Sequence, residues 1–260
     1  MRLEVLISCM HQTDTSIVER TGIQSDVLVI NQCDKEGTES FDFYNRKGEI
    51  CHARFIHTTE RGLSRSRNMA IANARGDIWL ICDDDEIMEA DYVEKITNAF
   101  KQHSDCQILA FALHHPKRKY PDVEQSVGYF RAAKLGSIQL AFRKCQLVTS
   151  VKFCEKMGSG TGNGGGEENK FVVDCLRRGA HARFIPAIIA SVAQTVSQWQ
   201  TGFGQKYWTD RGWVARMIYG PMLGFAYMWY VILLRSWRIG KEYSFGDKMK
   251  WMVRGFYEKR

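Results

Sequence analysis

The sequence predicts an α/β protein in which a mostly parallel, doubly wound sheet is covered by helices on both faces. Short apolar, β-branched runs recur along the first half of the chain, and such near-continuous apolarity is typical of strands covered on both faces. The runs occupy residues 3–8, 26–31, 53–58, 77–82 and 107–113. Helical patterns separate the later runs, and this alternation favours a parallel sheet whose ligands bind beyond the carboxyl ends of its strands.

A helix is expected in residues 62–76, between the third and fourth strands. Ser64 is its candidate N-cap and Gly76 its candidate terminator, with Met69, Ile71 and Ala72 facing the sheet. Further elements are expected downstream: a helix at 89–103, a long polar loop or small subdomain at 114–136, a strand at 137–143, a helix at 167–179 and a last strand at 182–190.

Charge divides the chain into two parts. The net charge is +7, from 36 basic and 29 acidic residues. Residues 1–200 hold 25 of each, so the whole excess, 11 basic against 4 acidic, lies in residues 201–260. We therefore expect one domain in residues 1–200 and a helical, basic and aromatic extension in 201–260.

Composition excludes several classes of protein. With 45% hydrophobic and 25% charged residues, the chain is neither disordered nor collagen-like. Its eight cysteines are scattered without a C-x-x-C pair. This pattern indicates reduced thiols in a cytoplasmic protein rather than a disulfide framework or a zinc site.

Four consecutive acids, Asp83 to Glu86, directly follow the fourth apolar run. Adjacent carboxylates repel one another, so a run of four at the end of a buried strand indicates a bound cation. Oxygen ligands suit Mg²⁺ or Mn²⁺, which proteins commonly share with substrate phosphates. The alternative is a solvated acidic turn.

A glycine-rich segment precedes the helix at 167–179. It has six glycines in the nine positions 158–166, followed by Glu167 and Glu168. Its G-x-G-x-x-G spacing does not indicate a dinucleotide site, because two carboxylates in the first helical turn would repel a pyrophosphate there. The glycines favour a mobile backbone that closely approaches a ligand. The acids alone could simply complement the helix dipole.

Together these segments resemble the family 2 glycosyltransferases, which have the GT-A fold and use nucleotide-sugar donors. Asp83 to Glu86 match the family's D-x-D motif, and GLSRSRN (62–68) is similar to its G-L-S-x-A-R-N segment. The resemblance implies that Asp83 and Asp84 lie at the nucleotide-sugar and that Asp85, with Asp83, binds Mn²⁺ or Mg²⁺. It also implies that Arg67 faces the nucleotide and diphosphate, a role that suits a guanidinium.

The resemblance extends to the donor base and the acceptor. It implies base contacts from the ends of the first two strands, at Cys9, His11 and Gln32. The family's proline-threonine and acidic pair are absent there; Gln32 can pair with a uracil edge, so a UDP-sugar is favoured while the base stays open. The family's third metal ligand, a histidine beyond the last strand, has no counterpart in residues 191–199.

The family's G-E-D motif corresponds here to Gly166, Glu167 and Glu168, with Gly165 preceding it in the acceptor loop. The resemblance implies that Glu168 is the general base that deprotonates an acceptor hydroxyl and that Glu167 orients the acceptor. The two glutamates could exchange roles. In-line attack at the anomeric carbon would then invert it.

An uncharged run, rich in Met and aromatics, extends over residues 217–234. Residues 235–260 follow it and contain eight basic and three acidic side chains with interleaved aromatics. This composition favours a segment lying on an anionic membrane surface. A core helix or a true membrane span are the alternatives.

We therefore expect an inverting glycosyltransferase of surface polysaccharide biosynthesis, peripheral on the cytoplasmic face of the cell membrane. Its partners would be a nucleotide-sugar donor, a glycan or lipid-linked glycan acceptor and the membrane surface, without nucleic acid. The alternatives are a non-catalytic nucleotide-sugar-binding module of the same fold and a nucleic-acid-binding protein that uses the basic tail.

Overall fold

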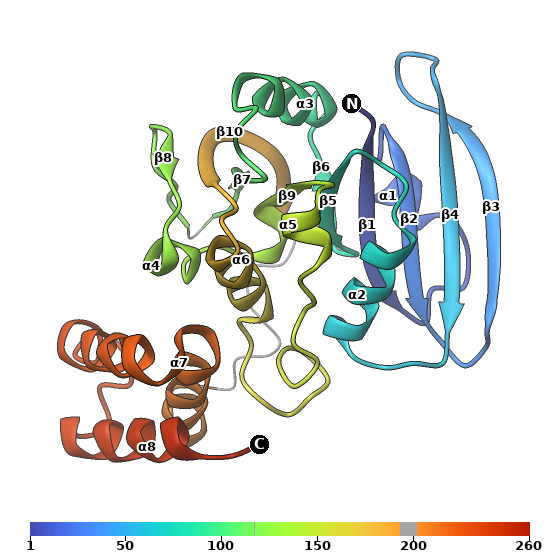
Figure 1. Ribbon diagram of the computed structural model, residues 1–260. Coiled ribbons are helices and arrows are strands. Elements are labelled where there is room, and N and C mark those ends of the chain that lie inside the picture. Colours follow the sequence, from blue (N-terminus) through green and yellow to red (C-terminus); the bar gives the residue numbers. More distant parts are fainter. Residues whose placement is uncertain (117, 193–201) are drawn as a thin grey trace.

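A mixed ten-stranded sheet forms the centre of the protein in a computed structural model that describes residues 1–116, 118–192 and 202–260 (Figure 1). The strands are β1 (Leu3–Met10), β2 (Asp26–Gln32), β3 (Gly37–Tyr44), β4 (Ile50–Thr58), β5 (Ile78–Asp83), β6 (Glu86–Met88), β7 (Ile108–His114), β8 (Gln125–Ser126), β9 (Leu140–Arg143) and β10 (Ala182–Val192). The helices are α1 (Ile17–Arg20), α2 (Leu63–Asn73), α3 (Tyr92–Gln102), α4 (Tyr129–Ala132), α5 (Gln146–Thr149), α6 (Glu167–Arg177), α7 (Gln205–Arg235) and α8 (Phe245–Tyr257), with a 3₁₀ turn η1 (Ser137–Gln139).

The strand order is β3-β4-β2-β1-β5-β9-β7-β10-β6, and β8 pairs with β10. Strands β4, β2, β1 and β5 are mutually parallel neighbours, as are β7 and β10. The expected α/β class with flanking helices and a helical C-terminal extension is confirmed. Parallel strands end at the same edge, so the ends of β1, β2 and β5 meet where ligands bind in such sheets.

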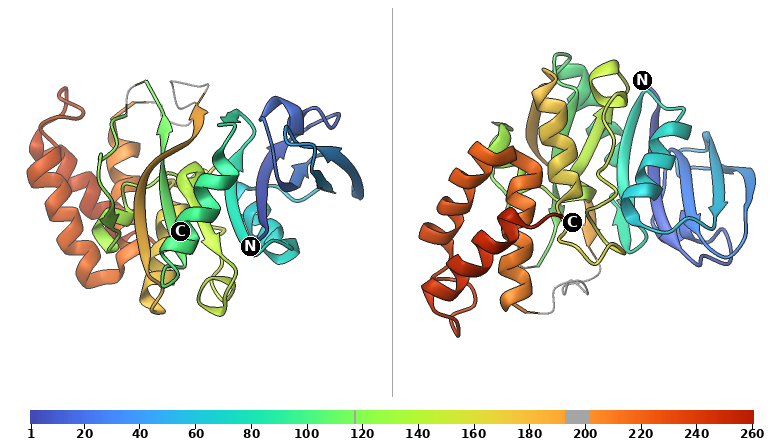
Figure 2. Two further views of the ribbon diagram at one scale, coloured as in Figure 1. Left: turned by 90° about the horizontal axis from the view of Figure 1, so that it is seen from above. Right: turned by 60° about the horizontal axis from the view of Figure 1, so that its bottom comes forward.

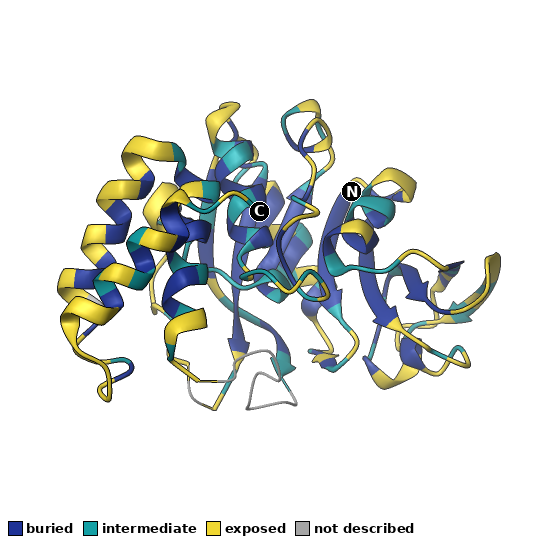
Figure 3. Ribbon diagram, turned by 90° about the horizontal axis from the view of Figure 1, so that it is seen from below, coloured by how far each residue is buried: buried dark blue, intermediate teal, exposed yellow. Residues whose placement is uncertain are grey.

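Alternating side chains of the strands enter two cores, one on each face of the sheet. Leu6 and Leu28 belong to a core that also contains residues of α2, α6 and the C-terminal helices, whereas Val5 and Val27 belong to a core that contains residues of α1 and α3. Figure 3 shows the buried strands between these layers. Burial on both faces explains why the parallel strands have continuous apolar sequences.

Three strands, β3, β6 and β8, were not predicted. β3 is an edge strand that pairs antiparallel with β4 and is mostly exposed, so its sequence GTESFDFY carries no long apolar run. β6 is very short and begins at Glu86, the last residue of the acidic motif, and β8 has only two residues, in the segment expected to be a long polar loop or small subdomain. The expected strand at 137–143 is also shorter: residues 137–139 form η1, and only 140–143 pair, antiparallel, with β5 and β7.

The expected N-cap of α2 and the inward position of Ala72 were wrong, whereas Met69 and Ile71 pack against the core as expected. Its N-cap is Gly62, while Ser64 is buried and its hydroxyl donates to the Met157 carbonyl oxygen at 2.9 Å. The helix buries Arg67 and Ala70, and Ala72 is exposed. The buried face is therefore partly polar, because it faces the ligand edge of the sheet as well as the core.

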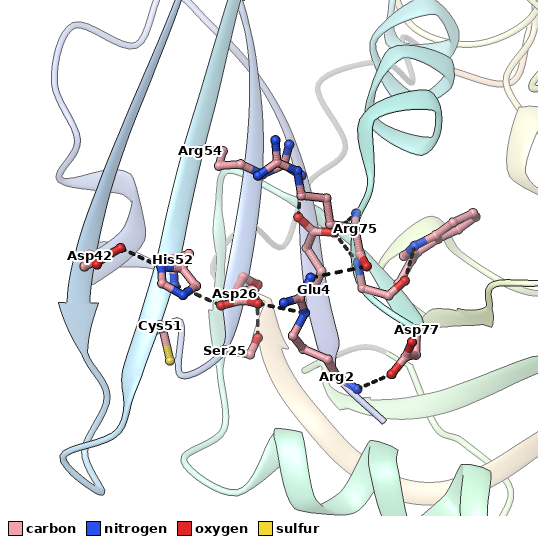
Figure 4. A network of polar contacts seen from close by, with 12 residues as sticks. Arg2, Glu4, Ser25, Asp26, Asp42, Cys51, His52, Arg54, Arg75 and Asp77 are labelled. Atoms are coloured by element: carbon pink, nitrogen blue, oxygen red, sulfur yellow. Dashed lines mark hydrogen bonds and ion pairs between the residues drawn. The ribbon is translucent and has the colours of Figure 1, made fainter.

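A charged network joins the strands at the opposite edge (Figure 4). The buried Glu4 carboxylate accepts from Arg54 at 2.7 Å and from the Gly76 backbone N–H at 2.7 Å. The Arg2 side chain pairs with Asp26 at 3.2 Å. Because these charges pair with one another, the cluster is explained as a structural ion-pair network. We therefore expect the functional site at the other edge of the sheet.

The C-terminal helices pack next to α6, at the end of the molecule away from β3 (Figures 1 and 2). Trp213 and Ile218 of α7 belong to the same buried cluster as Phe171 of α6. The extension thus shares a core with the sheet domain. The boundary expected near residue 200 lies in 193–201, outside the described residues.

Helix α7 is broken in its middle. Its residues Gln205–Leu234 are long enough and apolar enough to cross a membrane, with a mean hydropathy of 1.5. However, Gly220 has φ 77° and precedes Pro221. A Cβ atom at Gly224 would lie 2.6 Å from the Ala215 carbonyl oxygen, so the two halves pack against each other. The uncharged run 217–234 therefore does not form one straight helix.

Candidate functional site

The acidic motif forms the tight turn between β5 and β6. Asp83 ends β5, Asp84 is exposed in the turn, and Glu86 begins β6 and is 2% exposed. Burial, together with the charges of Asp83 and Asp85, raises the pKa of Glu86 well above its usual range. Burial and the charges of Asp83 and Asp84 likewise raise the pKa of Asp85. The turn is therefore a negative site that would be stabilised by a cation.

Arg67 connects this turn to the glycine-rich segment. Its guanidinium, on a side chain 2% exposed, donates to Asp83 Oδ1 at 3.1 Å and to Glu167 Oε1 at 2.9 Å. Burial opposes its charge, but the carboxylates of Asp83, Glu167 and Glu168 outweigh that effect and raise its pKa. Its Nε is buried and has no partner among the described residues. The structure thus brings together two motifs that lie far apart in the sequence.

The paired glutamates at the start of α6 have different surroundings. Glu167 is 5% exposed and fixed by Arg67 and by the Gly166 backbone N–H, which donates to its Oε2 at 3.0 Å. Glu168 is partly exposed, its carboxylate accepts from its own backbone N–H, and it forms no ion pair with the other described residues. Burial and the Glu167 charge raise the pKa of Glu168 to about 8, against the opposing effect of Arg67. One glutamate is therefore anchored, and the other is available for proton transfer.

The glycine-rich segment needs its glycines for close packing and backbone geometry. Gly158 has φ 95°, and a Cβ atom there would lie 2.9 Å from the Glu167 carboxyl carbon. Gly166, the N-cap of α6, has φ 102°. Gly165 is exposed beside it. L-residues rarely adopt such φ values, so substitution would displace the glutamates.

Contacts from α7 also hold this segment, and no sequence signal predicted them. Lys206 donates to the Gly162 carbonyl oxygen at 2.9 Å and pairs with Asp210 at 2.7 Å. Arg260 pairs with Asp210 at 2.6 Å and donates to Asn163 at 3.3 Å. The C-terminal extension therefore supports the loop that carries the glutamates.

The residues expected at the donor base lie at the ends of β1 and β2. Cys9 is buried and its Sγ lies 3.7 Å from the Ile30 carbonyl oxygen; burial raises the pKa of this thiol, which keeps it neutral. His11 is exposed with φ 51°, and its backbone N–H donates to the Gln32 carbonyl oxygen at 3.0 Å. The Gln32 side chain accepts from Gly62 N–H at 2.7 Å, so it also positions the start of α2.

Two polar residues near this site were missed. His57 on β4 contacts Asn31 at 3.1 Å through Nδ1 and Glu39 at 3.1 Å through Nε2. Ser137 in η1 donates to Asp83 Oδ2 at 3.5 Å. Glu39 belongs to the unpredicted strand β3, and Ser137 reaches β5 only because β9 runs antiparallel. Local sequence carries no signal for either.

The acidic turn fits a divalent cation by its donor chemistry. Asp83 and Asp85 supply carboxylate oxygens, which hard cations prefer, and burial, followed by the charges of Asp83 and Asp84, raises the pKa of Asp85. Within residues 1–116, 118–192 and 202–260, no three acidic, His or Cys side chains gather as a closed metal site. Substrate oxygens would therefore have to complete the coordination. The position of a third protein ligand in 191–199 lies mostly outside the described residues.

Comparison with known proteins identifies the sheet domain. The family model described as glycosyl transferase family 2 matches residues 7–148, more than half of the chain. No curated protein sequence matches significantly. The matched region includes Arg67 and the acidic turn but ends before Glu167 and Glu168.

Solved structures share the fold at low identity. TarS of S. aureus, residues 1–349 in complex with UDP-GlcNAc, has a TM-score of 0.58 and 13% identity, covering 88% of this chain and 69% of that one. The longer S. aureus TarS structure gives 0.57 and 14%, covering 100% of this chain and 44% of that one. The mannosyltransferase PcManGT of Pyrobaculum calidifontis, in complex with GDP-Man and Mn²⁺, gives 0.58 and 12%, covering 98% and 73%.

Proposed function

Because this chain belongs to glycosyl transferase family 2, a family of sugar-transferring enzymes, we propose that it is an inverting, metal-dependent transferase that moves a sugar from a nucleotide-sugar to a glycan or lipid-linked glycan. One observation carries the proposal. Arg67 holds the acidic turn and the paired glutamates in one site, with Glu168 left free beside them. A structural ion-pair cluster alone would not require a second, unpaired carboxylate.

Glu168 acts as the general base. Its carboxylate takes the proton of the acceptor hydroxyl while that oxygen attacks the anomeric carbon from the face opposite the leaving nucleoside diphosphate. Displacement from the opposite face inverts the anomeric carbon. Glu167 fixes the start of α6 through Arg67, so it positions Glu168 and orients the acceptor.

Asp83 and Asp85 hold the divalent cation, Mn²⁺ or Mg²⁺, which stabilises negative charge on the departing diphosphate. Arg67 holds Asp83 in place by pairing with it. Asp84, exposed in the same turn, faces the nucleotide-sugar. Cys9, His11 and Gln32 line the donor-base end of the site, and a UDP-sugar is the favoured donor.

The C-terminal extension binds to the cytoplasmic face of the cell membrane. After the break in α7, a group of large apolar side chains is exposed: Met222 85%, Leu223 45%, Leu233 57%, Leu234 59% and Trp237 62%. Residues 235–260 add eight basic side chains against three acidic ones. An exposed apolar face beside positive charge is suited to an anionic lipid surface, where a lipid-linked acceptor of surface polysaccharide synthesis would be found.

The donor claim is tested by thermal shift with a panel of nucleoside diphosphates and nucleotide-sugars, each with and without Mn²⁺. We expect at least one to stabilise the protein only with the metal, and Asp85→Ala to abolish this shift. Glu168→Gln should keep the shift and lose turnover, which also separates an enzyme from a non-catalytic binding module. If none of the compounds stabilises the protein in a metal-dependent way, the proposal is refuted.

The membrane claim has its own test. We expect Leu233→Gln/Leu234→Gln to weaken cosedimentation with vesicles that contain anionic lipid. The matched control Tyr44→Gln/Ile50→Gln alters exposed apolar residues on the distant β3–β4 hairpin and should bind like the wild type. Equal binding by all three proteins would contradict the proposed surface.

A further inference from the structure

A cavity of about 670 Å³ lies between residues 118–121, the segment around α4 and the start of β10. Four of its lining residues are basic: Arg118, Lys119, Arg131 and Lys134. No acidic residue lines it within the part of the chain that the structure describes. A concave site with four like charges raises the local concentration of anions.

The positive charge of this cavity is not neutralised within the described part of the chain, where none of the four basic side chains forms an ion pair. Basic residues on the nearby α6 differ, because Lys170 and Arg177 both pair with Asp174. The Arg118 guanidinium donates to the Lys134 carbonyl oxygen and lies 5.1 Å from the centre of the Tyr120 ring. It is therefore held at the cavity without a counter-ion.

The floor of the cavity is aromatic. Tyr120 stacks on Phe184 with ring centres 6.2 Å apart, and both residues line the cavity. The Tyr120 hydroxyl itself is enclosed by protein atoms, so the basic side chains supply the hydrogen-bond donors of the cavity. Guanidinium and ammonium groups gathered around one concave site suit the oxygens of a phosphate group.

The wall segment of the cavity is hydrogen-bonded to elements that carry the proposed catalytic residues. Asn169, the residue after Glu168, donates to the carbonyl oxygens of Ala132 at 2.7 Å and Leu135 at 2.9 Å. Ser137, in the same wall segment, donates to Asp83 at 3.5 Å. The donor-base residues lie instead at the ends of β1 and β2. The wall segment of the cavity is thus hydrogen-bonded to the helix that carries the proposed base and to the acidic turn, and we therefore assign the cavity to the acceptor side of the site.

We propose that this cavity binds a phosphate group of the acceptor, so that the enzyme glycosylates a phosphate-bearing acceptor. This inference rests on the proposed function and adds the chemical class of the acceptor. The phosphate belongs either to a lipid carrier or to a water-soluble glycan, and two probes distinguish these sources.

The test is calorimetric titration of the full chain with octyl phosphate below its micelle concentration and with α-glucose 1-phosphate. Octyl glucoside and glucose serve as phosphate-free counterparts. Arg131→Glu/Lys134→Glu removes two cavity cations, and Arg46→Glu/Lys101→Glu changes the net charge equally at exposed sites elsewhere. Arg131→Gln/Lys134→Gln repeats the test without reversed charge.

We expect at least one phosphate probe to bind the wild type and its phosphate-free counterpart not to bind. The Kd of that probe should rise about tenfold or more in both cavity variants, as expected for loss of charged hydrogen bonds. The Arg46→Glu/Lys101→Glu control should bind like the wild type. Tighter octyl phosphate indicates a lipid-linked acceptor, and tighter glucose 1-phosphate indicates a soluble phosphoglycan.

The inference is overturned if neither phosphate probe binds or if the control loses binding equally. It is also overturned if the cavity variants lose binding of the nucleoside diphosphate selected with Mn²⁺, because the cavity would then hold the donor diphosphate. Failure of the proposed function looks different: no nucleoside diphosphate binds any of the proteins.

Discussion

The role of Glu168 predicts a specific dependence of turnover on pH. Its pKa is raised from the ordinary 4.5 to about 8 by burial and by Glu167. A base must be deprotonated, so about 1% of the free enzyme is competent at pH 6 and about 10% at pH 7. We expect kcat/KM to rise about tenfold per pH unit below 8 and then to level off. Glu167→Gln should move the inflection to lower pH, because it removes a neighbouring negative charge.

The assay is release of nucleoside diphosphate from the nucleotide-sugar that the thermal panel selects, measured between pH 5.5 and 9.5. Glu168→Gln should lower kcat by about 100-fold or more. A pH profile of the wild type that is flat from 6 to 8, or an unchanged inflection in the residual activity of Glu168→Gln, would refute the assignment.

The same pKa predicts an effect on stability. The folded state holds the Glu168 proton more tightly than the unfolded chain does, so this contribution is fully present below about pH 4.5 and is lost as the pH rises to about 8. Each unit of difference between the folded and unfolded pKa corresponds to about 1.4 kcal/mol. Glu168→Gln should therefore unfold at higher urea than the wild type at pH 9, and this advantage should shrink at pH 5.

Three further predictions concern the support of the site. Arg67→Met should lower the free energy of unfolding by about 3–5 kcal/mol in urea denaturation, because it leaves buried carboxylates unpaired. The control Arg65→Met breaks an exposed ion pair and should change this free energy by less than about 1 kcal/mol. Similar losses in the two variants would contradict the bridging role of Arg67. Gly158→Ala should reduce both stability and kcat, because the added Cβ atom would meet the Glu167 carboxylate. Gly162 has φ 73° and no atom within 4 Å of an added Cβ atom, so Gly162→Ala should introduce only backbone strain. Equal kcat in the two variants would argue against close packing at Gly158. Removal of divalent ions with EDTA should abolish turnover and leave the circular dichroism spectrum unchanged, and full activity in EDTA would exclude the metal role.

Much of the donor half of the molecule could be predicted from local sequence. Strands buried on both faces must be apolar along their length, so β1, β2 and β5 were visible, and the position of Asp83 followed from the end of β5. The start of α6 was equally predictable, because a run of glycines precedes an amphipathic helix that opens with two acids. The exposed strand β3 was missed because an edge strand can be polar.

Contacts between distant segments could not be predicted in this way. The orientation of α2, which buries Arg67, depends on what α6 presents to it, and the pairing of Asp83 with Glu167 through Arg67 has no local signature. The antiparallel insertion of β9 likewise brings Ser137 to Asp83. Burial and hydrogen bonding between elements, rather than propensity, set these arrangements.

The sequence therefore established the α/β class, the acidic and glycine-rich motifs and the concentration of positive charge in residues 201–260, since each is a property of composition or short-range spacing. The tertiary structure established that Glu167 is ion-paired with Arg67 while Glu168 forms no ion pair, and that α7 turns back at Gly220. It also established that four basic residues without ion-pair partners in the described chain line one cavity. The physical reason is the same in each case. A carboxylate or a guanidinium acquires its role from the charges and the burial around it, and those are supplied by parts of the chain far away in sequence.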